Sequence, residues 1–69
     1  MESIFNYTSP DGNCEANLIG EFIGDTDSVE NAELIITRRE PQYIFTYLFT
    51  GNMEECYNFS IDKINNLPE

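Results

Sequence analysis

The sequence of 69 residues contains no histidine and no tryptophan, and only three of its residues are basic. The absence of histidine removes the most common general base, the usual activator of a serine or cysteine nucleophile and the commonest transition-metal ligand. Catalysis would depend on carboxylates alone, in a domain with little room for a deep cleft around them. We therefore expect no catalytic residues and no enzymatic activity.

Metal-binding and cofactor-binding motifs are also missing. The two cysteines, with no histidine and no third thiol, cannot make a zinc site. The acidic segment that starts at Asp25 opens like a calcium loop, but Val29 occupies a ligand position and Glu30 stands where the turn needs glycine. The sequence predicts no metal and no cofactor, and it leaves open whether residues 25–33 form a loop, a short helix or a weak metal site.

No apolar run reaches the length of about 18 residues that a transmembrane helix needs. Residues 1–6 lack the basic and apolar regions of a signal peptide. We therefore predict a cytoplasmic protein with no membrane partner. In a reducing compartment Cys14 and Cys56 are expected to be buried thiols rather than a disulfide, although the sequence does not decide their redox state.

Acidic residues dominate the charge, with 13 Asp and Glu against 3 Lys and Arg, a formal net charge of −10 and a pI near 4.1. Such a chain is a poor partner for nucleic acid or an anionic membrane and a good one for a basic protein surface. Solubility alone accounts for a net charge of roughly 2 to 8 in a small domain. The excess predicts a basic partner, although acids on a solvated sheet face also have the simpler role of keeping a protein soluble.

Alternating apolar residues and turn signals predict a single, mostly β domain over residues 1–69. Turns are indicated at 9–12, where the sequence is SPDG, at 39–42 around Pro41, and at 51–54. They separate five predicted strands, at 3–8, 13–23, 32–39, 43–50 and 56–61. We expect a five-stranded antiparallel meander that forms a curled sheet or a partly open barrel.

A small α+β fold remains an alternative, because a short helical turn fits residues 25–33 or the C-terminus. Val29, Ala32 and Ile36 have the spacing of a helical stripe, whereas the β-branched run around them favours a strand.

The candidate binding residues are carboxylates and tyrosines. Glu15 and Glu21 are expected on one face of a single strand, about 20 Å apart. The predicted acidic surface comprises Glu15, Glu21, Asp25, Asp27, Glu30, Glu33, Glu54 and Glu55. Tyr43, Tyr47 and Tyr57 are the aromatic candidates, since a partly exposed tyrosine among carboxylates is a typical interface anchor.

These features favour a non-enzymatic inhibitor or modulator that occupies a basic site on a larger protein, such as a nuclease or a nucleic-acid-binding complex. Nucleic-acid mimics of phage, including anti-CRISPR and anti-restriction proteins, fit this description, as do immunity proteins and antitoxins. The alternative is a small accessory or assembly subunit that docks through an aromatic sheet face or an edge strand. An unpaired sheet edge also permits a homodimer.

Overall fold

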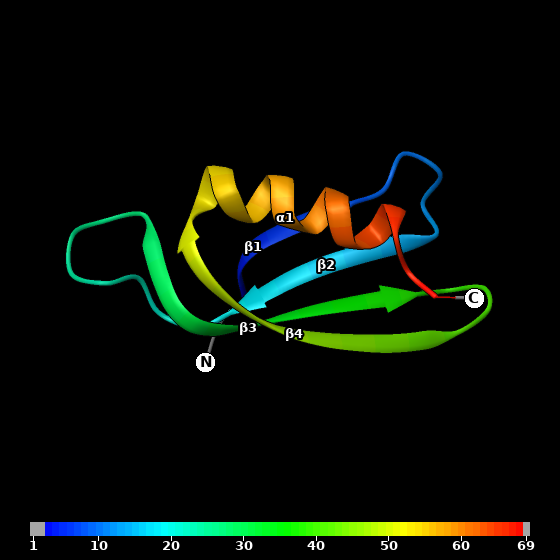
Figure 1. Cartoon of the computed structure of the whole chain (residues 1–69), viewed down its shortest axis with the longest axis horizontal. Coiled ribbons are helices and arrows are strands. Elements are labelled where there is room, and N and C mark those ends of the chain that lie inside the picture. The colour runs from blue at the N-terminus through cyan, green and yellow to red at the C-terminus, as the bar shows by residue number, and fades with distance from the viewer. Residues whose placement is uncertain (1–2, 69) are drawn as a thin grey trace.

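The computed structural model describes residues 3–68, which form one antiparallel sheet and one helix. The elements are β1 (Ser3–Thr8), β2 (Cys14–Ile19), β3 (Ser28–Arg38), β4 (Tyr43–Asn52) and α1 (Met53–Asn65). The strands lie in the order β1-β2-β3-β4, and α1 crosses one face of the curled sheet (Figure 1). The predicted mostly β antiparallel meander is confirmed, with four strands instead of five.

The fifth strand, predicted at residues 56–61, is wrong because these residues belong to α1. A capping box starts the helix: the side chain of Asn52 accepts a hydrogen bond from the Glu55 N–H at 2.8 Å, and the Glu55 carboxylate accepts one from the Asn52 N–H at 2.9 Å. Cys56 and Ser60, four residues apart, then lie buried on the face that meets the sheet. The C-terminal helical turn considered as an alternative is thus part of a helix of 13 residues.

The second predicted strand, 13–23, also ends earlier than expected. β2 stops at Ile19, and residues 20–27 form a loop that leaves the sheet. Gly20 permits a close approach there, since a Cβ at this position would lie 3.0 Å from the Cβ of Ala32. The segment 25–33 contains no helical turn: the loop ends at residue 27 and β3 begins at Ser28.

A β-bulge explains the helix-like spacing in β3. The register with β4 shifts between Val29 and Ala32, where Glu30 and Asn31 together lie opposite Thr50. Asn31 has a φ of 53°, in the left-handed region that asparagine tolerates, and its N–H donates to the Thr50 hydroxyl at 3.0 Å. The extra residue keeps Val29 and Ala32 on the same buried face although they are three apart.

The core lies between α1 and the face of the sheet that α1 covers. Leu18, Leu34 and Tyr47 lie side by side across β2, β3 and β4, and Leu18 and Leu34 are completely buried. The opposite face of the sheet has no covering layer in the described part of the chain and carries alternating polar and aliphatic residues. This single thin core has to stabilise the whole fold.

Asn52→Ala is expected to lower the free energy of unfolding by about 1 kcal/mol, because it removes the acceptor that caps the first turn of α1. Urea unfolding followed by circular dichroism measures the change. Asn58→Ala is the matched control, since Asn58 is exposed in the middle of the same helix and alanine there gains helix propensity. Equal effects of the two substitutions would contradict the capping role.

Candidate functional site: an acidic end

One end of the molecule, here called the acidic end, combines the loop at 20–27, the bulge of β3 and the first turn of α1. The pairing of Ser28 with Asn52 brings the start of β3 next to the start of α1. Figure 1 shows this end on the left, where the loop lies beside the yellow start of the helix. Its carboxylates are Glu21, Asp25, Asp27, Glu30, Glu33, Glu54 and Glu55.

All three basic residues lie at the other end. Arg38 ends β3, Arg39 follows it in the turn to β4, and Lys63 is in the last turn of α1. The longest dimension of the protein is 38 Å, and the helix and strands run along it (Figure 1). Because exposed charges are screened beyond about 8 Å at physiological ionic strength, these cations do not neutralise the acidic end.

Glu15 does not belong to the acidic end. It lies at the start of β2, where it shares a hollow with Arg39 and accepts a hydrogen bond from the Asn6 side chain at 3.1 Å. The prediction that Glu15 and Glu21 share one strand face is wrong, because the chain leaves the sheet after Ile19. The structure therefore places seven of the eight predicted acids together and separates the eighth.

The loop that supplies three of these acids is held by its own hydrogen bonds. The Ile23 N–H donates to the Ser28 carbonyl at 2.8 Å, and the Thr26 N–H donates to the Ile23 carbonyl at 3.1 Å. The Thr26 hydroxyl also donates to the Ile23 carbonyl, at 2.6 Å, and accepts from the Ser28 N–H at 3.2 Å. Gly24, with a φ of 54°, makes this turn possible. The loop thus presents its side chains in a defined arrangement.

Two apolar residues lie exposed within this acidic loop. Phe22 is 41% exposed and Ile23 is 49% exposed, between Glu21 and Asp25 in the sequence. The strand predicted at 13–23 placed both residues within the sheet, so sequence reasoning missed them as loop residues. A large apolar side chain surrounded by charges is the usual form of an interface anchor.

A shallow hollow adjoins the loop, with a volume of about 420 Å³. Glu21, Glu30 and Glu33 contribute to its lining together with the aliphatic Ile19 and Ala32. No group of residues within 3–68 is arranged to hold a metal ion. Carboxylates beside an aliphatic surface complement an arginine or lysine side chain, which has an apolar stem and a charged head.

The two acids of α1 differ in their availability. The Glu55 carboxylate is engaged with the backbone of Asn52 in the capping box, whereas Glu54 is exposed in the first turn. Negative side chains at a helix N-terminus are stabilised by the helix dipole. Because its side chain is exposed and outside the capping box, Glu54 is available to a partner, whereas Glu55 has a structural role.

The structure does not bring the three candidate tyrosines together. Tyr43 begins β4 at the end opposite the acidic loop and is exposed. The Tyr47 ring packs edge-on against Phe59, with centroids 6.1 Å apart, and the exposed Tyr57 packs edge-on against Tyr7 at 5.3 Å. The predicted aromatic residues thus form no common binding patch.

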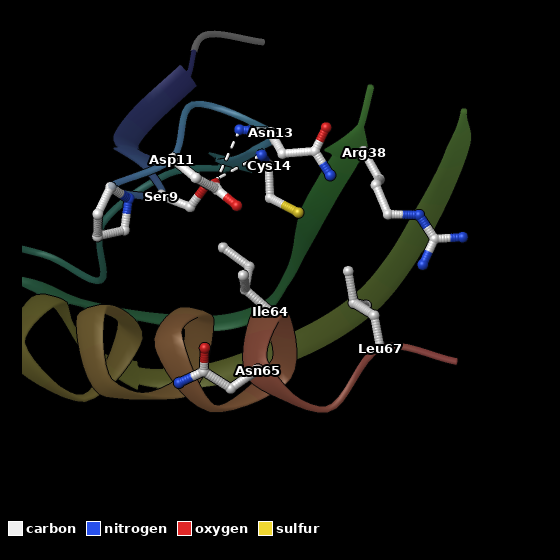
Figure 2. A pocket seen from close by; sticks show the side chains of 9 residues that line it. Ser9, Asp11, Asn13, Cys14, Arg38, Ile64, Asn65 and Leu67 are labelled. Carbon is white, nitrogen blue, oxygen red and sulfur yellow. Dashed lines mark hydrogen bonds between the residues drawn. The ribbon is translucent and has the colours of Figure 1, made fainter. Parts of the chain in front are cut away.

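A second hollow, of about 480 Å³, lies between the β1–β2 turn and the end of α1 (Figure 2). Asp11 accepts hydrogen bonds from the Ser9 hydroxyl at 2.6 Å and from the Asn13 N–H at 3.0 Å, and these bonds hold the pKa of Asp11 below its ordinary value of 3.8. The sulfur of Cys14 points into the hollow, and burial raises the pKa of this thiol. The acid is thus engaged in the turn and the thiol is protonated at neutral pH, which makes it a poor nucleophile.

Arg38, at the rim of the same hollow, holds backbone segments together. Its Nε donates to the Pro41 carbonyl at 2.8 Å, and a terminal nitrogen donates to the Pro68 carbonyl at 2.6 Å. The guanidinium also lies 5.2 Å from the centroid of the Phe45 ring. Arg38 thus ties the C-terminal tail to the β3–β4 hairpin.

Alkaline pH is expected to destabilise the protein through its two buried thiols. Burial raises the pKa of Cys14 and of Cys56 above the ordinary value of 9.0, so the folded state keeps both protonated where the unfolded chain would ionise. This contribution is complete below pH 9.0 and is lost as the pH rises above it. Urea midpoints should fall above pH 9.0 more steeply for the native chain than for the double variant Cys14→Ala/Cys56→Ala. Equal slopes would contradict the role of the thiols.

Within residues 3–68, α1 is the only helix and is neither long nor apolar enough to cross a bilayer. Comparison of the chain with protein-family models, with curated proteins and with solved structures finds no match. The geometry and charge of the described residues are therefore the basis for a functional proposal.

Proposed function

We propose that this protein is a non-enzymatic inhibitor or modulator that binds a larger protein and covers a basic, nucleic-acid-binding surface with its acidic end. The observation that carries the proposal is the segregation of charge: seven carboxylates gather at one end, and every lysine and arginine lies at the other. The three cations offset most of the charge of the carboxylates that share their end, Asp11, Glu15, Glu40 and Asp62, so the uncompensated negative charge of the described residues is concentrated in the acidic end.

The proposed binding mode has an electrostatic and an apolar component. The carboxylates of the loop and bulge take the place of phosphates opposite the partner's lysines and arginines. One cationic side chain enters the hollow bordered by Glu21, Glu30 and Glu33. Phe22 and Ile23 fill an apolar depression of the partner and exclude water from the neighbouring ion pairs.

Competition with nucleic acid follows from this mode, because the same basic residues would bind either ligand. Anti-defence proteins of phage, immunity proteins and antitoxins are classes that act on a nuclease or a nucleic-acid-binding complex in this manner. The alternative of an accessory subunit that docks through an aromatic sheet face is less well supported, since Phe59 of α1 packs against Tyr47 and Phe49. The same alternative also allows an accessory subunit to dock through an edge strand, and β4 is an edge strand of the sheet.

The test compares two variants that each remove three negative charges. The acidic-end variant is Glu21→Gln/Asp25→Asn/Asp27→Asn, and the control variant is Glu15→Gln/Glu40→Gln/Asp62→Asn, whose residues lie outside the acidic end. Each protein is immobilised and exposed to lysate from its source cells at about 0.15 M salt and then washed at about 1 M, where the screening length falls to about 3 Å.

The native chain and the control variant should retain the same nucleic-acid-binding protein, which mass spectrometry identifies and which high salt or added DNA or RNA releases. The acidic-end variant should bind that protein at least about 10-fold more weakly at 0.15 M salt, since several ion pairs are lost together. A partner that resists high salt, or that binds all three forms equally, would contradict the proposal.

A further inference from the structure

Strand β4 has β3 on one side and no neighbour on the other within the described part of the chain. Its ten residues, Tyr43–Asn52, include no charged side chain and no proline. Natural sheets protect their edges with charges, proline, bulges or short strands, because free N–H and C=O groups would otherwise pair with another strand. The other edge has such protection, since β1 is only six residues long and contains a register shift. The long β4 edge is unprotected.

The side chains of β4 on the uncovered face are apolar at two exposed positions. Ile44 is 60% exposed and Leu48 is 68% exposed, and Thr46 lies midway between them on the same face. Residues directly opposite each other in an antiparallel pair project from the same face of the sheet. If β4 pairs with its own copy about a two-fold axis at Thr46, Ile44 of each copy therefore lies opposite Leu48 of the other. That register covers both exposed aliphatic side chains at once.

We propose that β4 pairs in antiparallel fashion with β4 of a second copy of this chain, with the two-fold axis at Thr46, so that two four-stranded sheets become one continuous sheet. Backbone hydrogen bonds along β4 and the two Ile44–Leu48 contacts hold the pair together.

The distribution of charge favours the same arrangement. Because the chain carries a net charge of −10, any pairing that placed the two acidic ends side by side would be strongly repulsive. Antiparallel pairing of β4 instead places the acidic ends at opposite extremities. The turn after β3, with Arg39 and Glu40, then lies near the start of α1 of the other copy, which carries Glu54 in its first turn. The uncharged edge and the segregated charges thus both select a second copy in this orientation.

Engineered disulfides test both the contact and its register. Thr46→Cys should cross-link to itself under mild oxidation, because opposite residues in an antiparallel pair have Cα atoms about 4.5–5.5 Å apart, within the range of a disulfide. Gln42→Cys is the control: it is exposed, but in the proposed register its two copies are eight residues out of alignment, about 27 Å apart. Because the native thiols are buried, the unmodified chain should not cross-link and serves as the negative control.

A mixing experiment makes the register explicit. Ile44→Cys alone and Leu48→Cys alone should not cross-link, since each residue is about 14 Å from its own copy. A mixture of the two single variants should give the mixed dimer. Self-linking of either single variant as efficient as the mixed product would overturn the proposal, as would cross-linking of Gln42→Cys as fast as that of Thr46→Cys.

Light scattering after gel filtration gives an independent readout. The native chain of 8.0 kDa should elute with twice that mass, and Leu48→Lys should elute as a monomer. Thr8→Lys, an exposed site on the uncovered face of β1, should remain a dimer. At about 100 μM protein, a dimer with a dissociation constant of about 1 μM would be almost fully formed. A native chain that is monomeric at this concentration would reject the dimer and would leave the proposed binding through the acidic end unaffected.

Discussion

Replacement of Leu34 by alanine should lower the free energy of unfolding by about 2–5 kcal/mol, the largest loss of stability expected from a single substitution. Leu34 is completely buried at the centre of β3, between Leu18 of β2 and Tyr47 of β4. A Leu→Ala change at such a site costs about 2–5 kcal/mol, because it removes buried apolar surface and leaves a cavity. Domains have about 0.05–0.15 kcal/mol of stability per residue, so a chain of this length has roughly 3–10 kcal/mol in total. The expected loss is a large part of that stability.

Ile35→Ala is the matched control for this prediction. Ile35 is the next residue of β3, lies on the uncovered face and is partly exposed. The substitution also removes strand propensity, but it opens no cavity in the core, so we expect a loss of about 1 kcal/mol. Urea unfolding followed by circular dichroism compares the two variants. Similar losses would mean that the core between α1 and the sheet does not determine stability.

Replacement of Phe22 by alanine should have the largest effect on binding of any single substitution. Its side chain is 41% exposed in the free protein, in a loop that also carries Glu21, Asp25 and Asp27 and that hydrogen bonds hold in shape. Anchors of this kind typically contribute 2 kcal/mol or more, which corresponds to a loss of affinity of about 30-fold. Stability should change little, because Phe22 lies outside the core. The affinity is measured by titrating each variant with the partner protein that high salt releases from the native chain.

Tyr57→Ala provides the comparison, since Tyr57 has a similar exposed fraction of 47% but lies on α1. The acidic-end proposal requires Tyr57→Ala to bind nearly as well as the native chain. If instead Tyr57→Ala abolished binding and Phe22→Ala did not, the partner would dock on the helix. The accessory-subunit alternative would then replace the acidic-end proposal.

Most of the strand positions could be predicted from local patterns. The turn at 9–12, Pro41 and the alternation in 43–50 correctly define three strands and the antiparallel meander. The alternation of Tyr57, Phe59 and Ile61 was misleading, because a run this short fits a strand and a helix equally well. The capping pair Asn52 and Glu55 was the local signal of a helix.

The acidic end could be anticipated only in part. That residues 21–33 are rich in acids and poor in bases is evident in the sequence. Strand spacing could not show that Glu54 would join them, because that proximity depends on the pairing of Ser28 with Asn52. Nor could it place Phe22 outside the sheet, since an uninterrupted alternation through residue 23 resembles a strand that continues.

Composition and local order thus determined the class of the protein: a small acidic β meander that contains no histidine. The tertiary structure decided the arrangement of its charges. Alternation, turns and caps depend on neighbouring residues and can be recognised locally. A loop, a bulge and the start of a helix lie at the same end of the molecule because of the strand register, which is a long-range property. The free edge of β4 is likewise visible only in the tertiary structure, where the residues after β4 form α1 and pack on the face of the sheet instead of pairing beside that strand.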